Sequence, residues 1–349
     1  MKTNTRVDPG SAPASGLCFL SRPVLLLAVV VLLVLAVRPA RAETLLWTNV
    51  TGGNWNVAAN WEPNRVPASG DEVVATNAGT YTVTLNVNAS PARLTLGAES
   101  GIQTLAIPGS TFTLQTEGRV IGNGVLALSG GTLTGSGVLT MRNVMDWTGG
   151  TMSGSAATVI AAGGTLKLSG AAQKTLSQRS VTNLGTVVWS GAGRIMTRSG
   201  APFRNEAGGV FEVENDVGYV KDPDPESGGA GSFHNAGLFR KTGGPGTTTF
   251  QAIPFSNTGT ISVGSGTLNF SSPPTLGATT TFEIGLVGPS QTGGYGRITC
   301  SQAIQLVGHL AVTFVGGFLP GPGEDYPVIV APIRGEIQSF SAPLISPEV

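Results

Sequence analysis

One short phrase occurs four times in the second half of the chain: an apolar residue stands two positions before an asparagine, and a glycine follows. The four copies are Val181-Thr-Asn183-Leu-Gly185, Phe203-Arg-Asn205-Glu-Ala-Gly208, Phe233-His-Asn235-Ala-Gly237 and Phe255-Ser-Asn257-Thr-Gly259. Their asparagines are separated by 22, 30 and 22 residues, and a period of this size is typical of one coil of a solenoid. The repeat therefore predicts a chain wound into stacked coils rather than a closed globule.

Each phrase also predicts which side chains face inward. Residues two apart on a strand share a face, so Val181 and the phenylalanines of the other copies should point into the coil. We expect Asn and Gly to turn the chain between faces, because Asn tolerates the left-handed conformation and Gly takes positive φ without strain. Stacked strands lie about 4.8 Å apart, so the asparagine side chains should bond to their copies in neighbouring coils.

The gap of 30 residues holds Lys221-Asp-Pro-Asp-Pro-Glu-Ser-Gly-Gly-Ala-Gly231, and we interpret its extra length as a loop that leaves one coil. Solenoids accept such insertions at turns. Before the four phrases, short apolar runs alternate with glycine turns. Examples begin at Gly124, Gly131, Gly137, Gly150 and Gly164. From residue 71 to 274 we estimate roughly nine coils.

Composition agrees with an all-β chain. Of 349 residues, 51 are Gly, only 11% are charged and 6% are aromatic, which is poor in helix formers and rich in turn and strand formers. We therefore predict a parallel β-helix, or β-solenoid. Lys plus Arg equal Asp plus Glu at 20 each, so charge favours no nucleic acid or anionic membrane as a partner.

The beginning of the chain has the pattern of an export signal. Fourteen apolar residues, Val24 to Val37, follow Arg22, and Ala40-Arg-Ala42 has the small-x-small pattern of a cleavage site. As a helix the apolar run is about 21 Å long, short of the roughly 30 Å hydrocarbon core. We predict that residues 1–42 are a cleaved signal peptide, with an uncleaved anchor as the alternative. The mature protein would be secreted or on the cell surface, without a permanent membrane span.

After cleavage the chain would retain one cysteine, Cys300, and could form no internal disulfide. Cys300 lies in the strand-like run Arg297-Ile-Thr-Cys-Ser, so we expect a buried thiol that packs as a small apolar group. A nucleophilic role is the alternative, but no histidine is nearby in sequence.

A tryptophan-rich segment follows the predicted signal peptide: Trp47, Trp55 and Trp61 precede Val66-Pro67 and Gly70-Asp71. This cluster, the later Gly-Gly-Thr-Leu runs and the asparagine phrases resemble secreted bacterial β-solenoids of the autotransporter-passenger and filamentous-haemagglutinin-like adhesin type. The resemblance implies a right-handed winding and a role outside the cell. The end of a solenoid needs covering, so the tryptophans are interpreted as a cap, with a sugar-stacking platform as the alternative.

These patterns predict four segments. Residues 1–42 form the signal peptide, 43–74 the N-terminal cap, 75–275 the solenoid repeats and 276–349 a C-terminal β cap. The last segment has longer alternating runs, such as Leu306 to Phe314. Because neither an outer-membrane barrel nor an anchor is visible after it, we expect a released protein or a truncated piece.

Few residues suggest chemistry. His234 and His309 are isolated and do not make a metal site. Asp222, Asp224 and Glu226 alternate in the long loop, but two prolines stiffen it and the spacing differs from calcium motifs. We predict no catalytic, cofactor-binding or metal-binding residues, and no cofactor.

Two function classes remain. The preferred one is a non-catalytic solenoid in cell-surface adhesion or an extracellular matrix, which binds surface glycans or other cell-envelope components through many weak contacts. The alternative is a polysaccharide lyase or glycosidase that uses Lys221, Asp222, Asp224 and Arg240. The first is preferred because we expect the strand faces to carry mostly Thr, Ser and Gly rather than the paired acids that a glycosidase needs. The oligomeric state is left open.

Overall fold

The computed structural model describes residues 42–343, and the statements below concern that part of the chain. The predicted signal peptide lies outside the described residues, apart from Ala42. The described chain is almost entirely β, with three short 3-10 segments and no α-helix: η1 (Ala58–Asn60), η2 (Pro225–Ser227) and η3 (Ser290–Thr292). Between residues 42 and 343, no helix has the length and apolar character needed to cross a membrane.

Three long sheets run along the described unit. Sheet A has the order β3 (Trp61–Glu62), β1 (Thr44–Trp47), β4 (Glu72–Ala75), β6 (Arg93–Leu96), β9 (Glu117–Val120), β12 (Val138–Met141), β15 (Ala157–Ile160), β18 (Ser180–Asn183), β21 (Pro202–Asn205), β24 (Ser232–Asn235), β27 (Phe255–Asn257) and β30 (Thr275–Leu276). Sheet B has the order β2 (Gly53–Asn54), β5 (Tyr81–Thr84), β7 (Gln103–Ile107), β10 (Gly124–Leu128), β13 (Val144–Trp147), β16 (Thr165–Leu168), β19 (Thr186–Trp189), β22 (Val210–Val213), β25 (Leu238–Lys241), β28 (Thr260–Val263), β31 (Thr281–Leu286), β34 (His309–Phe314) and β37 (Ser339–Ser341). Sheet C comprises β8 (Thr111–Thr113), β11 (Thr132–Thr134), β14 (Gly150–Met152), β17 (Lys174–Ser177), β20 (Ile195–Arg198), β23 (Gly218–Lys221), β26 (Thr247–Gln251), β29 (Thr267–Phe270), β32 (Arg297–Cys300) and β35 (Ile329–Val330). A small fourth sheet pairs β33 (Ile304–Leu306) with β36 (Ile333–Gly335).

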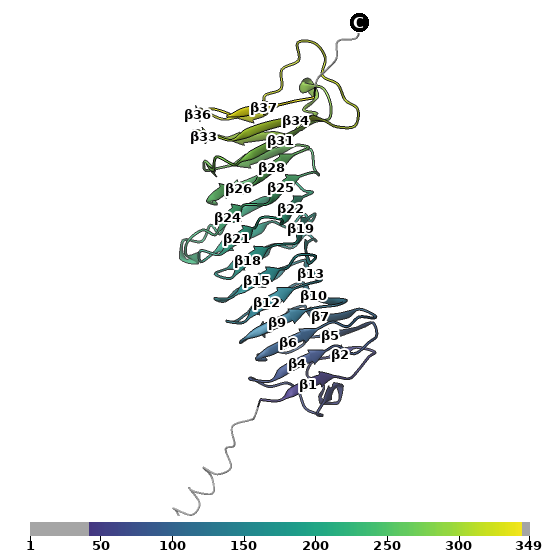
Figure 1. Cartoon of the computed structure of the whole chain (residues 1–349). Coiled ribbons are helices and arrows are strands. Elements are labelled where there is room, and N and C mark those ends of the chain that lie inside the picture. Colours follow the sequence, from purple (N-terminus) through teal and green to yellow (C-terminus); the bar gives the residue numbers. More distant parts are fainter. Residues whose placement is uncertain (1–41, 344–349) are drawn as a thin grey trace, which may run out of the picture. The chain divides into compact units, whose positions relative to one another are not determined.

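Successive coils stack in parallel register, so each strand pairs with the equivalent strand of the next coil (Figure 1). The pairing of β18 with β21, and of β21 with β24, aligns the repeated phrases residue by residue. From β4 to β27 sheet A contains nine strands, which agrees with the estimated number of coils. The predicted β-solenoid is therefore confirmed, including the short strands before the asparagine phrases.

The core is a column of side chains that point into the coils. Phe203, Phe233 and Phe255 are buried and stack face to face, with ring centroids 5.2 Å apart in both pairs. Their planes differ by 5° and 1°. Val181 continues this row through its pairing with Phe203. Because apolar area leaves water only when one coil covers the next, each layer depends on its neighbours for stability.

The repeated asparagines form a buried ladder. Nδ2 of Asn183 donates to Oδ1 of Asn205 at 2.7 Å, Asn205 donates to Asn235 at 2.7 Å, and Asn235 donates to Asn257 at 2.6 Å. All four side chains are fully buried. The predicted axial alignment is confirmed, and every amide donates in the same direction along the stack.

The glycines of these phrases serve a different purpose from the one predicted. None of the four asparagines, and of the glycines only Gly208, has positive φ. At Gly185, Gly237 and Gly259 a Cβ atom would lie 2.2–2.3 Å from a backbone oxygen of the preceding coil. The expectation of a left-handed turn was wrong for these positions, because the close approach of stacked turns is what excludes a side chain.

Three cations are buried inside the coils: Lys174, Arg179 and Lys241. Burial lowers the pKa of Arg179 to about 10 and also lowers that of Lys174. Lys241, which interrupts the apolar pattern of its phrase, bonds to Asp216 at 2.7 Å and to the carbonyls of Asn215 and Gly243. Each cation therefore bonds to polar groups, mostly backbone carbonyls, and the irregular Lys241 is accommodated without changing the register.

At the N-terminal end, Trp47, Trp55 and Trp61 are almost completely buried, and β3 pairs antiparallel with β1. The indole rings pack edge to face at 4.9 Å in the Trp47–Trp61 and Trp55–Trp61 pairs. A sugar-stacking platform requires open ring faces, so this alternative is wrong for these three residues.

Asp71, from the Gly-Asp element of the tryptophan-rich segment, forms hydrogen bonds to several segments at this end of the solenoid. Its carboxylate receives both terminal nitrogens of Arg65, at 2.6 and 2.9 Å. It also accepts the backbone N–H groups of Ala68 at 2.6 Å and Glu43 at 3.1 Å. Burial raises the pKa of Asp71, but these hydrogen bonds outweigh it and hold the pKa below 3.8, the ordinary value.

We expect Asp71→Asn to destabilise the first coils by about 1.5–3 kcal/mol near neutral pH, because charge-assisted hydrogen bonds are lost. A depressed folded pKa means that the carboxylate contributes this stability fully above its unfolded pKa and loses it as pH falls through the folded value. Amide hydrogen exchange in strands β1 and β4 should therefore show an acid-sensitive opening in the wild type that is weaker in the variant. Equal pH dependence in the two proteins would contradict this assignment.

Near the other end, β31 and β34 are six-residue strands, as the longer alternating runs suggested. They continue sheet B in parallel register. The final coil leaves apolar side chains exposed: Phe340, which pairs with Leu310, is 64% exposed and Ile333 is 48% exposed. The predicted C-terminal cap thus remains a prediction, and its last residues, 344–349, lie outside the described residues.

Candidate functional site

The acidic loop between β23 and β24 leaves the coil, as its extra length indicated (Figure 1). Two of its carboxylates, those of Asp222 and Asp224, accept hydrogen bonds from the backbone of the loop. Asp222 is buried and accepts the backbone N–H of Asp224 at 3.0 Å, and Asp224 in turn accepts the N–H of Glu226 at the start of η2. A contact of 3.8 Å joins Asp222 to Arg198. These bonds fold the loop and do not direct its acids toward one point outside it.

The two cations of the enzyme alternative, Lys221 and Arg240, lie in different sheets. Lys221 ends β23 in sheet C and is exposed, whereas Arg240 belongs to β25 in sheet B. Arg240 pairs with Glu212 of the preceding coil at 2.7 Å. The structure does not combine Lys221, Asp222, Asp224 and Arg240 into one site.

The two histidines lie in different sheets, and each bonds to a serine one coil later. Nδ1 of His234 is 2.8 Å from Oγ of Ser256, and Nδ1 of His309 is 2.6 Å from Oγ of Ser339. His234 is half-buried. Cys300 is a buried free thiol, as predicted. Between residues 42 and 343 there is no cluster of three or more His, Cys, Asp or Glu side chains placed to hold a metal ion.

A shallow depression on the outer face of sheet A is the best candidate for a site; we call it the sheet A groove. It consists of three adjoining hollows along strands β1, β4, β6, β9 and β12. Their volumes are about 330, 60 and 670 Å³. Glu72 and Arg93 line the first two hollows, and Glu117 and Arg119 line the second and third. Because neighbouring hollows share residues, the groove is continuous across these strands.

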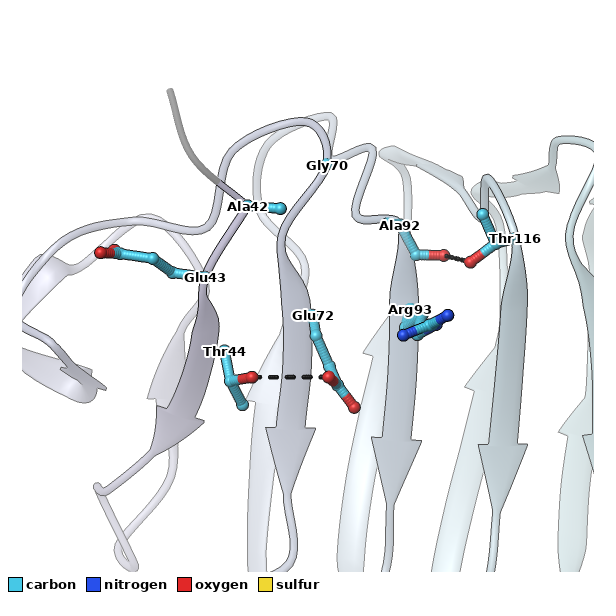
Figure 2. A pocket seen from close by; sticks show the side chains of 8 residues that line it. All are labelled: Ala42, Glu43, Thr44, Gly70, Glu72, Ala92, Arg93 and Thr116. Atoms are coloured by element: carbon cyan, nitrogen blue, oxygen red, sulfur yellow. Dashed lines mark hydrogen bonds between the residues drawn. The ribbon is translucent and has the colours of Figure 1, made fainter. Parts of the chain in front are cut away.

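Figure 2 shows the N-terminal part of the groove, where Thr44, Glu72 and Arg93 project from three successive strands. Thr44 donates a hydrogen bond of 3.4 Å to Glu72, and the hydroxyl of Thr116 donates to the carbonyl of Ala92 at 2.7 Å. These positions face outward because the alternate residues of the same strands, such as Val73 and Leu94, are buried.

Farther along the groove, ion pairs position the charged groups. Glu117 contacts Arg93 at 3.4 Å and Arg119 at 3.0 Å, while both arginine side chains remain more than half exposed. Arg142 is exposed at the far side of the largest hollow. Hydroxyl groups of Thr95 and Thr140 line the same hollow. The surface therefore offers exposed charges and hydroxyls in an open channel rather than a deep pocket.

The sequence reasoning missed this groove. The expectation that strand faces carry mostly Thr, Ser and Gly was wrong for β4, β6 and β9, where Glu72, Arg93, Glu117 and Arg119 point outward. A signal was present: a charged residue begins each of the strand-like runs Glu72-Val-Val, Arg93-Leu-Thr-Leu and Glu117-Gly-Arg-Val. It becomes a site only when the coil register aligns Glu72, Arg93 and Glu117 in one row.

The chain matches no protein-family model, and comparisons with curated proteins and with solved structures give no match either.

Proposed function

We propose that this protein is an exported, non-catalytic β-solenoid that acts in cell-surface adhesion or in an extracellular matrix. The observation that carries the proposal is the sheet A groove, which is open and continuous over strands of five stacked coils. An open channel of this kind suits an extended polymer, such as a surface glycan, better than a small molecule that needs enclosure. Export is supported by the apolar leader before Ala42.

The affinity of such a surface would come from repetition. Each coil contributes one to three polar side chains, and contacts of this exposed kind are individually weak. A polymer that touches several coils at once makes its later contacts intramolecularly, so weak contacts combine into useful avidity. Binding should therefore strengthen steeply with the length of the glycan until the groove is filled.

One observation favours the alternative of a polysaccharide-degrading enzyme. Glu72 and Glu117 are aligned on either side of Arg93, and two strand spacings separate their backbones by roughly 10 Å. The two acids of inverting glycosidases lie about 6.5–9.5 Å apart. However, Glu117 is engaged by Arg93 and Arg119, which leaves it poorly placed to exchange protons with a substrate.

A glycan array combined with depolymerisation assays would separate the two functions. For the adhesion or matrix role we expect length-dependent binding to at least one polysaccharide, with no loss of polymer viscosity on long incubation. A loss of viscosity that Glu72→Gln or Glu117→Gln abolishes would instead establish the enzyme. Asp222→Asn serves as the matched control, because its carboxylate lies in the loop and outside the groove.

A further inference from the structure

We propose that the sheet A groove selects an acidic polysaccharide whose uronate carboxylates bind three arginines: Arg93, Arg119 and Arg142. We call this row the arginine diagonal. The inference rests on the proposed function and names the class of polymer that the groove takes.

Strand register places Arg93 and Arg119 on one oblique line, and Arg142 extends this line from the residue after β12. Arg119 pairs with Thr95, which is two residues beyond Arg93 on the neighbouring strand. Thr140 pairs with Arg119, and Arg142 is two residues beyond Thr140. Each step combines one strand spacing of about 4.8 Å with two residues of about 3.3 Å, so successive arginine backbones lie about 8 Å apart. A bound polymer would therefore cross sheet A obliquely to the coil axis.

Charge along this line is unbalanced. Arg93 and Arg119 share a single carboxylate, that of Glu117. Arg142 makes no ion pair with any residue in the range 42–343, and it borders the largest hollow. Two more glutamates line the hollows nearer the N-terminal side: Glu43, which pairs with Arg65, and Glu72, which accepts from Thr44 and is the register partner of Arg93. The excess of positive charge therefore lies at the far end of the groove, where Arg119 and Arg142 line the largest hollow with a single carboxylate, that of Glu117.

The chemistry of the groups favours a carboxylated sugar. A guanidinium presents paired donors that match the two oxygens of a carboxylate. Thr95 and Thr140 lie between the arginines and supply hydroxyls that can bond to the hydroxyls of the sugar ring. Exposed side chains need not be desolvated fully, so several such pairs together can give binding that depends on salt.

The test uses the full chain and three ligands of equal length: a polygalacturonate oligomer, its methyl ester and a sulfated oligosaccharide. We expect the uronate to bind at least several-fold more tightly than the ester, with an affinity that falls as salt is added. Arg119→Gln combined with Arg142→Gln should weaken uronate binding roughly tenfold and reduce its salt dependence. Calorimetry or surface-based binding would measure these changes.

Arg204 provides the matched control. It is exposed on the same outer row of sheet A as Arg119, four strands farther along, and lies outside the groove. Arg204→Gln should leave uronate affinity within about twofold, as expected for a remote surface charge. Equal losses in Arg204→Gln and the double variant would overturn the arginine diagonal. Tighter binding of the sulfated ligand than of the uronate would overturn the choice of carboxylate.

The ester distinguishes this inference from the proposed function. Equal, salt-independent binding of the uronate and its ester would overturn the arginine diagonal while leaving a polysaccharide-binding groove. Binding of none of the ligands, and of no glycan on the array, would overturn both. Circular dichroism of each variant should match the wild type, because the substituted side chains are exposed and outside the core.

Discussion

Phe233→Ala should destabilise the central coils by about 3–5 kcal/mol, because it leaves a large cavity in a fully buried aromatic cluster. The ring of Phe233 lies within 5.1–5.7 Å, centroid to centroid, of six others: Phe203, Phe211, Tyr219, Phe239, Phe250 and Phe255. No coil buries this ring alone, so its loss weakens the contact between three successive layers.

Because repeat proteins do not always unfold in one step, the measurement should be local. Amide hydrogen exchange during chemical denaturation should show β21, β24 and β27 opening earlier in Phe233→Ala than in the wild type. Phe340→Ala is the control: this ring is 64% exposed, and its loss should change stability by less than about 0.5 kcal/mol. If the two variants were equally stable, the aromatic column would not be the main stabilising feature.

Asn235→Asp should cost about 3–5 kcal/mol near neutral pH, more than Asn235→Leu at about 2–3 kcal/mol. The amide of Asn235 donates to Oδ1 of Asn257 and to the carbonyl of Thr260, and its oxygen accepts from Asn205. A carboxylate at this position would still accept from Asn205 but would present an unpaired charge to two acceptors. Leucine removes the bonds without adding a buried charge.

The two variants should also differ in their response to acid. Protonation of the new carboxyl restores a donor toward Asn257, so Asn235→Asp should regain stability as pH falls, whereas Asn235→Leu should not. Asn56→Asp is the matched control, because Asn56 is exposed and its side-chain oxygen accepts from Asn86 at 2.8 Å. Thermal unfolding in neutral and mildly acidic buffer would show both effects. A pH-independent deficit in Asn235→Asp would contradict the ladder.

The ladder and the aromatic column were predictable because they repeat. Asn205 and Phe203 recur at the same positions of successive coils, so a fixed period was enough to place them in one row. The sheet A groove has no such repetition: Glu72, Arg93 and Arg119 are different residues in coils of unequal length. Their proximity depends on the register between coils, which an unaligned sequence does not reveal.

The glycines illustrate a second limit. Their positions after each asparagine were visible in the sequence. However, either a positive φ or the close approach of another backbone can require a glycine, and the sequence does not distinguish these two reasons. At Gly185 the reason is the backbone of the preceding coil, whose oxygens leave no space for a Cβ atom. In the second phrase the structural equivalent is Gly209, whereas its neighbour Gly208 adopts positive φ. Only the packing of adjacent turns distinguishes these cases.

The uniform stacking of the asparagine coils has a consequence for how such a protein can vary. A layer that carries Phe203 and Asn205 presents to the next layer nearly the same surface as one that carries Phe233 and Asn235. Duplication or deletion of an entire layer would therefore rejoin matching surfaces and alter the reach of the molecule in steps of about 4.8 Å. Selection could thus adjust the length of the stack without touching Arg93, Arg119 or Arg142.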